Sequence, residues 1–435
     1  MIQVLSSAWA LLLGLMLLMV GNGIQGTLLG IRGAIEGFSA FEMSIVMSSY
    51  FAGFLFGSRA APGLIRRVGH VRVFAALGSF ISAVLILYPA VADPIVWSIL
   101  RLAIGFCFSG VYVTAESWLN NAATNETRGK ALSLYLIVQM IGIIAAQGLV
   151  MAGDPSGFIL FIIPSVLVSI SFAPILLTVA PTPAFDTARR MTLRELFHNS
   201  PLGVVGMLLV GSAYAAQFGM AAVYGTEAGL SIRELTIFVS MFYVGGLVLQ
   251  YPIGQISDRM ERRQLIILTA FVAMVASIAA ALSESFIVLL AAAFMIGGML
   301  GPLYALLIAH TNDYLEPEDM AAASAGLMFV NGVGAIMGPL ATGWIMGAFG
   351  ANGFFVVLAV SLAALVAYGM WRTTQRAGVP VEDTASYVTV LAQASPVAVE
   401  LAQEVYVDAL EEEAANAENR ASEDILSQNS TPNAQ

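Results

Sequence analysis

Short polar breaks divide the chain into long apolar stretches, and this pattern limits the possible folds more than any other feature. A hydrocarbon core about 30 Å thick needs about 20 apolar residues per helix. Only 11% of the residues are charged, which is too few to cover a water-exposed surface and argues against a soluble enzyme or a nucleic-acid-binding protein. The sequence therefore predicts an all-α membrane protein surrounded by a lipid bilayer. The twelve expected transmembrane helices are 8–29, 43–61, 71–92, 95–118, 130–152, 157–179, 202–224, 235–256, 264–283, 286–310, 322–346 and 353–372.

The basic residues predict the orientation of these helices. Of the 18 Lys and Arg residues, 15 lie after even-numbered spans, in the central loop or in the C-terminal region. Arg32 and Arg233 lie on the opposite side, and Arg101 lies inside a span. Because cytoplasmic loops carry an excess of positive charge, both termini are expected in the cytoplasm. The first apolar stretch lacks a preceding basic residue and a cleavage site, so an uncleaved span of a multi-pass inner (plasma) membrane protein is expected.

An internal repeat with a constant offset of 192 residues runs along the chain. It superimposes polar residues and loop glycines that recur rarely by chance, as expected for a transporter with duplicated halves. The sequence thus predicts two pseudo-symmetric six-helix halves, residues 1–180 and 201–376, joined by a cytoplasmic linker at 181–200. The matched pairs include Gln25 and Gln217, Ser39 and Ser231, Glu42 and Glu234, Gly53 and Gly245, Gly105 and Gly297, and Tyr112 and Tyr304.

The C-terminal segment, residues 377–435, differs in composition from the membrane body. It holds 11 Asp or Glu residues and one basic residue, Arg420, and it accounts for the formal net charge of −10. We expect a mostly disordered cytoplasmic tail with one helix that begins at Ser395–Pro396, where an N-cap residue precedes proline. Both a solvated acidic helix and a partner-binding site fit this composition, whereas its acidity argues against binding to an anionic membrane surface.

A cytoplasmic motif follows the eighth predicted span and reads Gly254-Gln-Ile-Ser-Asp-Arg-Met-Glu-Arg-Arg263. It resembles the G-x-x-x-D-R-x-G-R-R signature of the major facilitator superfamily, except that Glu261 stands where the family prefers Gly. Glycine allows close helix packing, a carboxylate favours a helix N-terminus, and arginines bind carboxylates and anionic headgroups. The resemblance implies the major facilitator fold and a gating role for Gly254, Asp258, Arg259, Arg262 and Arg263.

The equivalent motif of the first half is degenerate. Pro62 replaces Gly and Arg66 replaces Asp, while Arg67 and Gly69 remain and His70 stands where Arg is usual. We therefore expect an asymmetric gate. In the second half, Asp258 is expected to support cytoplasmic closure by facing the start of span five near Arg128 and Gly129.

One face of the fourth predicted span carries charged residues at membrane depth. Arg101, Gly105, Phe108, Tyr112 and Glu116 recur at helical spacing. Arg101 and Gly105 resemble the superfamily's R-x-x-x-G motif, whose Arg is associated with proton coupling. An Arg inside a span is costly unless it faces a cavity or a partner, although snorkelling to the interface is the alternative. Glu116, the only carboxylate on this face, is the second coupling candidate; it lies about 22 Å from Arg101 along the helix, so the two cannot form an ion pair.

The resemblance also implies that spans one, four, seven and ten line a central cavity. Gln25, Arg101, Tyr112, Gln217 and Tyr304 are the predicted substrate-binding residues. Arg101 can bind an anionic or carboxylate-bearing solute, or it can serve proton coupling and leave the amides and tyrosines to bind a neutral polar molecule. Duplication that merely preserved structural hydrogen bonds is the competing interpretation.

The sequence thus predicts a proton-coupled secondary transporter, a symporter and monomer, that moves a small organic solute by alternating access. No cofactor, metal or nucleic acid is expected: the single Cys107 excludes cysteine-rich metal sites, and the chain has no nucleophile–base or metal motif of a membrane enzyme. A passive facilitator and a non-transporting sensor that signals through the acidic tail remain alternatives. Antiport is not supported, because span five lacks a Gly-Pro motif. The stretch from Glu116 to Lys130 most resembles the bacterial YcaD-like branch of the superfamily.

Overall fold

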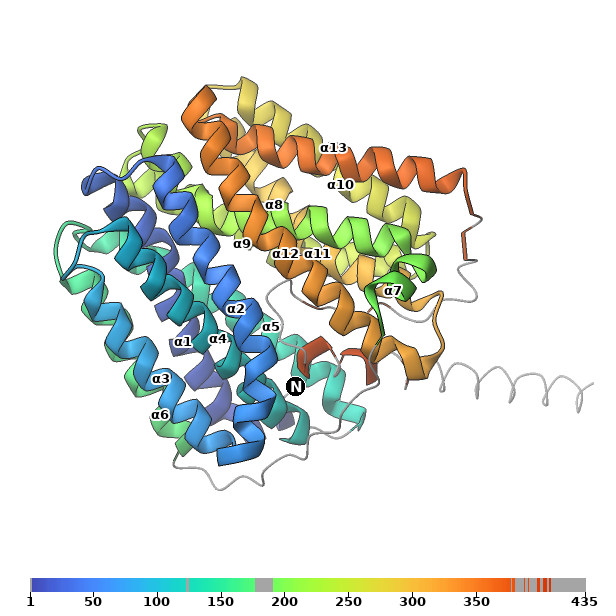
Figure 1. Cartoon of the computed structure of the whole chain (residues 1–435), viewed down its shortest axis with the longest axis horizontal. Helices are drawn as coiled ribbons and strands as arrows, with labels where there is room; N and C mark the ends of the chain where they lie inside the picture. Colours follow the sequence, from blue (N-terminus) through green and yellow to red (C-terminus); the bar gives the residue numbers. More distant parts are fainter. Residues whose placement is uncertain are drawn as a thin grey trace, which may run out of the picture.

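The computed structural model describes residues 2–122, 125–176, 191–376, 378, 379, 387, 390, 397–399, 402–404 and 407. These residues form thirteen α-helices and no strand (Figure 1). The first group comprises α1 (Ile2–Ile35), α2 (Ala40–Val68), α3 (His70–Leu87), α4 (Pro94–Ala122), α5 (Asn125–Ala152) and α6 (Ile159–Leu176). After the short α7 (Leu193–Asn199) come α8 (Pro201–Glu227), α9 (Ile232–Ser257), α10 (Arg262–Leu282), α11 (Phe286–Asn312), α12 (Pro317–Phe349) and α13 (Gly353–Thr373).

The helices confirm the predicted all-α membrane fold. Eleven of them are long and apolar enough to cross a membrane, and the apolar α6 takes the sixth place in the order. Several run beyond the predicted spans: α12 begins at Pro317, where proline occupies the first helical turn, and ends only at Phe349. Hydropathy locates the apolar centre of a span, whereas the caps and turns that decide its ends lie in water.

Equivalent helices begin in the same way in the two halves. The side chain of Ser39 caps α2 by accepting from the backbone N–H of Glu42, and Ser231 caps α9 by accepting from that of Glu234. Each Glu carboxylate accepts in return from the N–H of its serine, at 2.8 and 2.9 Å. Such a reciprocal box satisfies two N–H groups that a helix start leaves unpaired. The 192-residue repeat thus extends to the capping hydrogen bonds.

The repeat also fixes where helices cross. A Cβ atom on Gly53 of α2 would collide with the carbonyl oxygen of Leu102 in α4, and one on Gly245 of α9 would collide with that of Phe294 in α11. Gly105 and Gly297 make the reverse contacts, against the carbonyl oxygens of Tyr50 and Phe242. Small residues let membrane helices approach until their backbones touch. These four glycines therefore set the same α2–α4 and α9–α11 crossings in both halves.

The two six-helix bundles lie side by side and meet through α1 with α8, α2 with α12 and α5 with α9 (Figure 1). The contact is tight where α1 and α8 end: a Cβ on Gly30 would lie 2.7 Å from that of Ala222. We call the opposite end, where α2 leads into α3 and α9 into α10, the arginine-rich end. There, α4 and α11 share no comparable packing among the described residues. The halves are thus closed at one end and separated at the other.

Parts of the C-terminal segment return to the arginine-rich end. Its residues 397–399, 402–404 and 407 are helical, and they lie between the two bundles (Figure 1). Val397, Ala398, Val399 and Ala402 are buried. These residues fall within the range of the expected helix and are packed against the body. The predicted helix start at Ser395–Pro396 lies outside the described residues, as does the rest of the predicted disordered tail apart from residues 378, 379, 387 and 390.

Candidate functional site

Arg101 is buried in the middle of the first half, with only 1% of its surface exposed. It lies on the second turn of α4, where the Nη2 atom is 3.7 Å from the sulfur of Met47. The guanidinium lies 4.8 Å from the ring centroid of Tyr50, a cation–π contact, and the Tyr88 hydroxyl is within electrostatic range. Neither Nε nor Nη1 has a hydrogen-bond partner within the described part of the chain. The charge is therefore held by aromatic and sulfur atoms and keeps unused donors.

Gln25 belongs to the same cluster. Its Nε2 donates to the Tyr88 hydroxyl at 3.2 Å, while its Oε1 is buried without a partner among the described residues. Trp97, at the start of α4, donates to the backbone oxygens of Tyr88 and Val91, which fixes the position of Tyr88. The structure thus brings Gln25 and Arg101 together through Tyr88.

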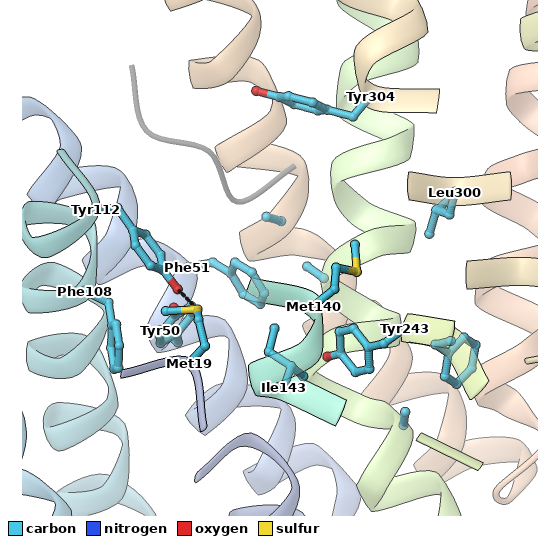
Figure 2. Packing of buried hydrophobic residues seen from close by; sticks show 14 of the residues in the cluster. Met19, Tyr50, Phe51, Phe108, Tyr112, Met140, Ile143, Tyr243, Leu300 and Tyr304 are labelled. Atoms are coloured by element: carbon cyan, nitrogen blue, oxygen red, sulfur yellow. Dashed lines mark hydrogen bonds between the residues drawn. The ribbon is translucent and has the colours of Figure 1, made fainter. Parts of the chain in front are cut away.

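Tyr112 forms a second cluster about three helical turns further along α4. Its hydroxyl accepts from Asn22 Nδ2 at 3.3 Å. The same hydroxyl donates to the sulfur of Met19 at 3.4 Å, the contact that Figure 2 shows. The rings of Phe54 and Phe108 pack against it, with centroids 5.9 and 6.0 Å away. Tyr112 is therefore packed in the core of the first half.

The predicted substrate-binding residues of the second half make fewer hydrogen bonds to described residues than those of the first half. Gln217 of α8 and Tyr304 of α11 are buried, and the Gln217 Oε1 and the Tyr304 hydroxyl have no hydrogen-bond partner among the described residues. In Figure 2 the Tyr304 side chain extends from its helix toward the half that carries Tyr112. Both second-half residues thus have buried polar atoms that no described residue pairs by a hydrogen bond.

A small pocket between the halves lies beside these clusters. It is lined by Asn22, Gly23, Gly26 and Thr27 of α1, by Phe218, Ala221 and Ala222 of α8, and by Val239 and Tyr243 of α9. None of the five predicted substrate-binding residues lines it. Asn22 connects it to Tyr112, and Phe218 connects it to Tyr50, because the two rings stack at 6.1 Å.

Tyr50 and Tyr88 are the important neighbours that the sequence did not indicate. Both are fully buried against Arg101. Tyr50 has a phenylalanine, Phe242, at its equivalent position in the second half, so the repeat gave no signal. Tyr88 lies at the end of an apolar stretch, where interface tyrosines are common. Only the fold brings the two rings to the same guanidinium.

Glu116, the other predicted coupling residue, lies near the arginine-rich end of α4 and is also buried. One carboxylate oxygen accepts from the Tyr135 hydroxyl of α5, and the other accepts from the backbone N–H of Ala398 at 3.3 Å. Arg101 and Glu116 therefore have separate sets of neighbours, as their spacing along the helix predicted.

The residues of the motif after α9 make two kinds of contact. Arg262 forms a buried ion pair with Asp313, and Arg263 donates to the carbonyl oxygen of Arg376 at 2.7 Å; both contacts stay within the second half. Asp258, at the end of α9, accepts from the backbone N–H of Tyr387 in the C-terminal segment at 2.7 Å.

The remaining motif residues are placed as follows. A Cβ on Gly254 would lie 2.9 Å from the Tyr387 ring, and Arg259 is exposed. The side chain of Arg128, the expected neighbour of Asp258, lies outside the described residues. Of the five predicted gating residues, Gly254 and Asp258 thus contact Tyr387 of the C-terminal segment, whereas Arg262 pairs within the second half.

Comparison with known families agrees with this architecture. The family model described as "Major Facilitator Superfamily" matches residues 11–282 and 218–398, which together span most of the chain.

Relatives and solved structures are similar over nearly their whole lengths. The "Uncharacterized MFS-type transporter YcaD" of Escherichia coli O6:K15:H31 is 28% identical over 80% of this chain and 91% of that protein. A mutant of the nucleoside transporter NupG has a TM-score of 0.74 at 15% identity and covers 84% of this chain and 99% of its own. A bacterial homolog of the human lysosomal transporter Spinster, in an inward-facing and unoccupied conformation, has a TM-score of 0.64 at 16% identity, with 93% and 98% covered.

Proposed function

Because the chain belongs to the Major Facilitator Superfamily, we propose that it is a secondary active transporter that moves a small organic solute by alternating access. One observation carries the proposal: the two bundles touch closely where α1 meets α8 and are separated where α4 faces α11. Rigid halves that close at one end and part at the other are the geometry required for rocking around a central site. A channel would need an open path along the whole interface.

The substrate is proposed to bind between the halves, near Arg101, Gln25 and Tyr112 on one side and Gln217 and Tyr304 on the other. Leaving a buried donor or acceptor unpaired costs about 1–3 kcal/mol, and the Arg101 Nε and Nη1, the Gln217 Oε1 and the Tyr304 hydroxyl are such groups. A polar solute that supplies partners recovers this cost on binding. Acceptor oxygens for Arg101 favour a carboxylate-bearing or otherwise oxygen-rich molecule.

Proton coupling is proposed to use Glu116. The Tyr135 hydroxyl and the Ala398 N–H both donate to this buried carboxylate. Glu116 shares its face of α4 with Arg101, and a carboxylate is the side chain on this face that can bind and release a proton. The excess of basic residues at the arginine-rich end supports an inner-membrane protein with both termini in the cytoplasm. The paired halves form a complete carrier, so a monomer is proposed.

The test begins with binding and ends with transport. Purified protein is heated with a panel of nucleosides, sugars, amino acids and small carboxylates, because a bound solute raises the unfolding temperature. The best compound is then loaded into proteoliposomes. Counterflow and saturation are expected of a carrier, and accumulation against a gradient is expected when an inward proton gradient is imposed. Flux that is linear in concentration and without counterflow would favour a passive facilitator.

The proposed site residues are tested with the same compound. Gln25→Ala and Gln217→Ala are expected to weaken binding without loss of folded protein, and Arg101→Ala to abolish either binding or proton-driven accumulation alone. Glu116→Gln is expected to keep counterflow but lose accumulation. Wild-type behaviour in all four variants would show that these residues have only structural roles.

A further inference from the structure

The C-terminal segment contacts both halves at the end where they separate. We call residues 397–399 and 402–404 the docked segment, and its Val397, Ala398, Val399, Ala402 and Gln403 are all at least 93% buried. In an acidic tail that stayed in solution, these valine and alanine side chains would be exposed to water. The burial shows that the docked segment fits a surface of the membrane body.

Polar contacts fix the docked segment to one helix of each half. On the first half, the Ala398 N–H donates to Glu116 Oε2 of α4 at 3.3 Å. On the second half, Gln403 Nε2 donates to the backbone oxygen of Met320 at 2.7 Å and to the Ser324 hydroxyl, both in α12. One short segment therefore bridges the two bundles whose relative movement alternating access requires.

Tyr387, which precedes the docked segment, contacts the motif of the second half. The Tyr387 N–H donates to Asp258, and the Tyr387 ring lies against Gly254. Asp258 is the carboxylate that the sequence predicts for gating, and Glu116 is the one proposed above for coupling. The C-terminal segment thus donates a backbone hydrogen bond to one oxygen of each carboxylate.

We propose that the space between α4 and α12 at the arginine-rich end is a docking site for the chain's own residues 397–399 and 402–404, and that docking inhibits transport. The docked segment holds the two bundles apart at this end and covers Glu116, so the halves cannot rock to open the end where α1 meets α8. The inhibitory role rests on the proposed transport function, whereas the docking itself does not.

Docking is tested by protection of a thiol. In full-length protein with the native thiol removed by Cys107→Ala, Val399→Cys places a thiol at a position that is 1% exposed. Its alkylation by a membrane-permeant maleimide is expected to be at least about ten-fold slower than after unfolding in detergent, because only undocked molecules react. Adding Ala398→Pro, which removes the N–H donor to Glu116, is expected to restore fast alkylation. The matched Ala398→Gly keeps the donor and is expected to keep protection. Equally fast alkylation in all forms would overturn the docking.

Inhibition is tested by the opening of the far end. Ala222→Cys places a thiol where α1 and α8 touch, so an impermeant maleimide reacts with it only when that end opens. A chain ending at residue 395 lacks the docked segment, and a chain ending at residue 410 keeps it. The thiol at position 222 is expected to react about five-fold faster in the shorter chain. This increase follows if docking keeps about four molecules in five from opening the far end, because removing the segment lets all of them open it.

The outcomes separate the two proposals. Equal reaction in the two truncated chains, with the thiol at position 399 protected, would leave a docked but non-inhibitory segment and overturn the inhibitory role. No reaction at position 222 in either chain would contradict alternating access itself, and the inhibitory role with it, while protection at position 399 would still report docking.

Discussion

The arginine-rich ends of the two halves are built on equivalent positions but are held together by different contacts. In the second half, Arg262 at the start of α10 forms a buried ion pair with Asp313 at the end of α11. Arg263 pairs with Glu261 at 2.7 Å and donates to the carbonyl oxygen of Arg376, just after α13. Three helix ends of this half are thus joined by charged groups.

In the first half the same positions carry other residues. His70, buried at the start of α3, occupies the position equivalent to Arg262, and Asn121 occupies the position equivalent to Asp313. Arg66, at the place of Asp258, is exposed. The glycine crossings and capping boxes, by contrast, are the same in both halves. The comparison teaches that duplication preserved the packing scaffold, while the charged contacts that decide how firmly each end is held diverged.

The largest effect is expected from removing the buried ion pair of Arg262 with Asp313 in the second half. Arg262→Met leaves the Asp313 carboxylate buried without this guanidinium, which typically costs about 3–5 kcal/mol. His70→Met at the equivalent position of the first half removes an imidazole in place of a guanidinium and is expected to cost less. Thermal unfolding of both variants in detergent measures the difference. The double variant Arg262→Met with Asp313→Leu should recover part of the loss, and equal effects of the two single variants would remove the asymmetry.

A smaller effect, equal in the two halves, is expected at the shared crossings. Gly105→Ala and Gly297→Ala each push a methyl group into a carbonyl oxygen of the neighbouring helix, and such overpacking costs about 1–3 kcal/mol. Gly347→Ala is the control, since no atom lies within 4 Å of its Cβ position. Denaturation curves should superimpose for the first two variants and match the wild type for the third. A large difference between positions 105 and 297 would show that the halves differ in packing as well as in charge.

Sequence patterns predicted the features that repeat. The twelve apolar stretches gave the helices, and the 192-residue offset gave equivalent caps and crossings, because both depend on neighbouring residues or on a shared register. The cluster around Arg101 was predicted only in part: its helix face was evident, but Tyr50 and Tyr88 come from other helices and carry no repeat signal. The contact of Ala398 with Glu116 joins residues 282 positions apart, and no local pattern encodes it.

An intermediate effect, on function, is expected at the motif itself. Asp258→Asn keeps a side chain of similar size but weakens the charge-assisted hydrogen bond from the Tyr387 N–H, and it removes the carboxylate proposed for gating. Turnover in proteoliposomes should fall about ten-fold, equivalent to about 1.4 kcal/mol, with little change in the amount of folded protein. The exposed Arg66→Gln should change turnover less.

A second variant separates the two roles of Asp258. Tyr387→Pro removes the N–H donor and leaves the carboxylate in place, so turnover is expected to stay at or above the wild-type rate. A loss equal to that of Asp258→Asn would instead mean that Asp258 acts through the C-terminal segment alone. Equal losses at Asp258 and Arg66 would show that the degenerate first-half motif gates as strongly as the intact one.

The smallest stability effect is expected from the matched glutamines of α1 and α8, and it sharpens the comparison at the centre of the molecule. Gln25 donates to the Tyr88 hydroxyl at 3.2 Å, so Gln25→Ala loses a buried hydrogen bond worth about 1 kcal/mol. Gln217 has a buried Oε1 without a partner among the described residues, so Gln217→Ala removes an unpaired acceptor and should leave the unfolding temperature unchanged or slightly raised. If Gln217 is kept for the solute, the thermal stabilisation by a bound compound should fall more in Gln217→Ala than in Gln25→Ala. A stability loss at position 217 that equals the loss at position 25, with no change in ligand stabilisation, would show that duplication merely kept two structural amides.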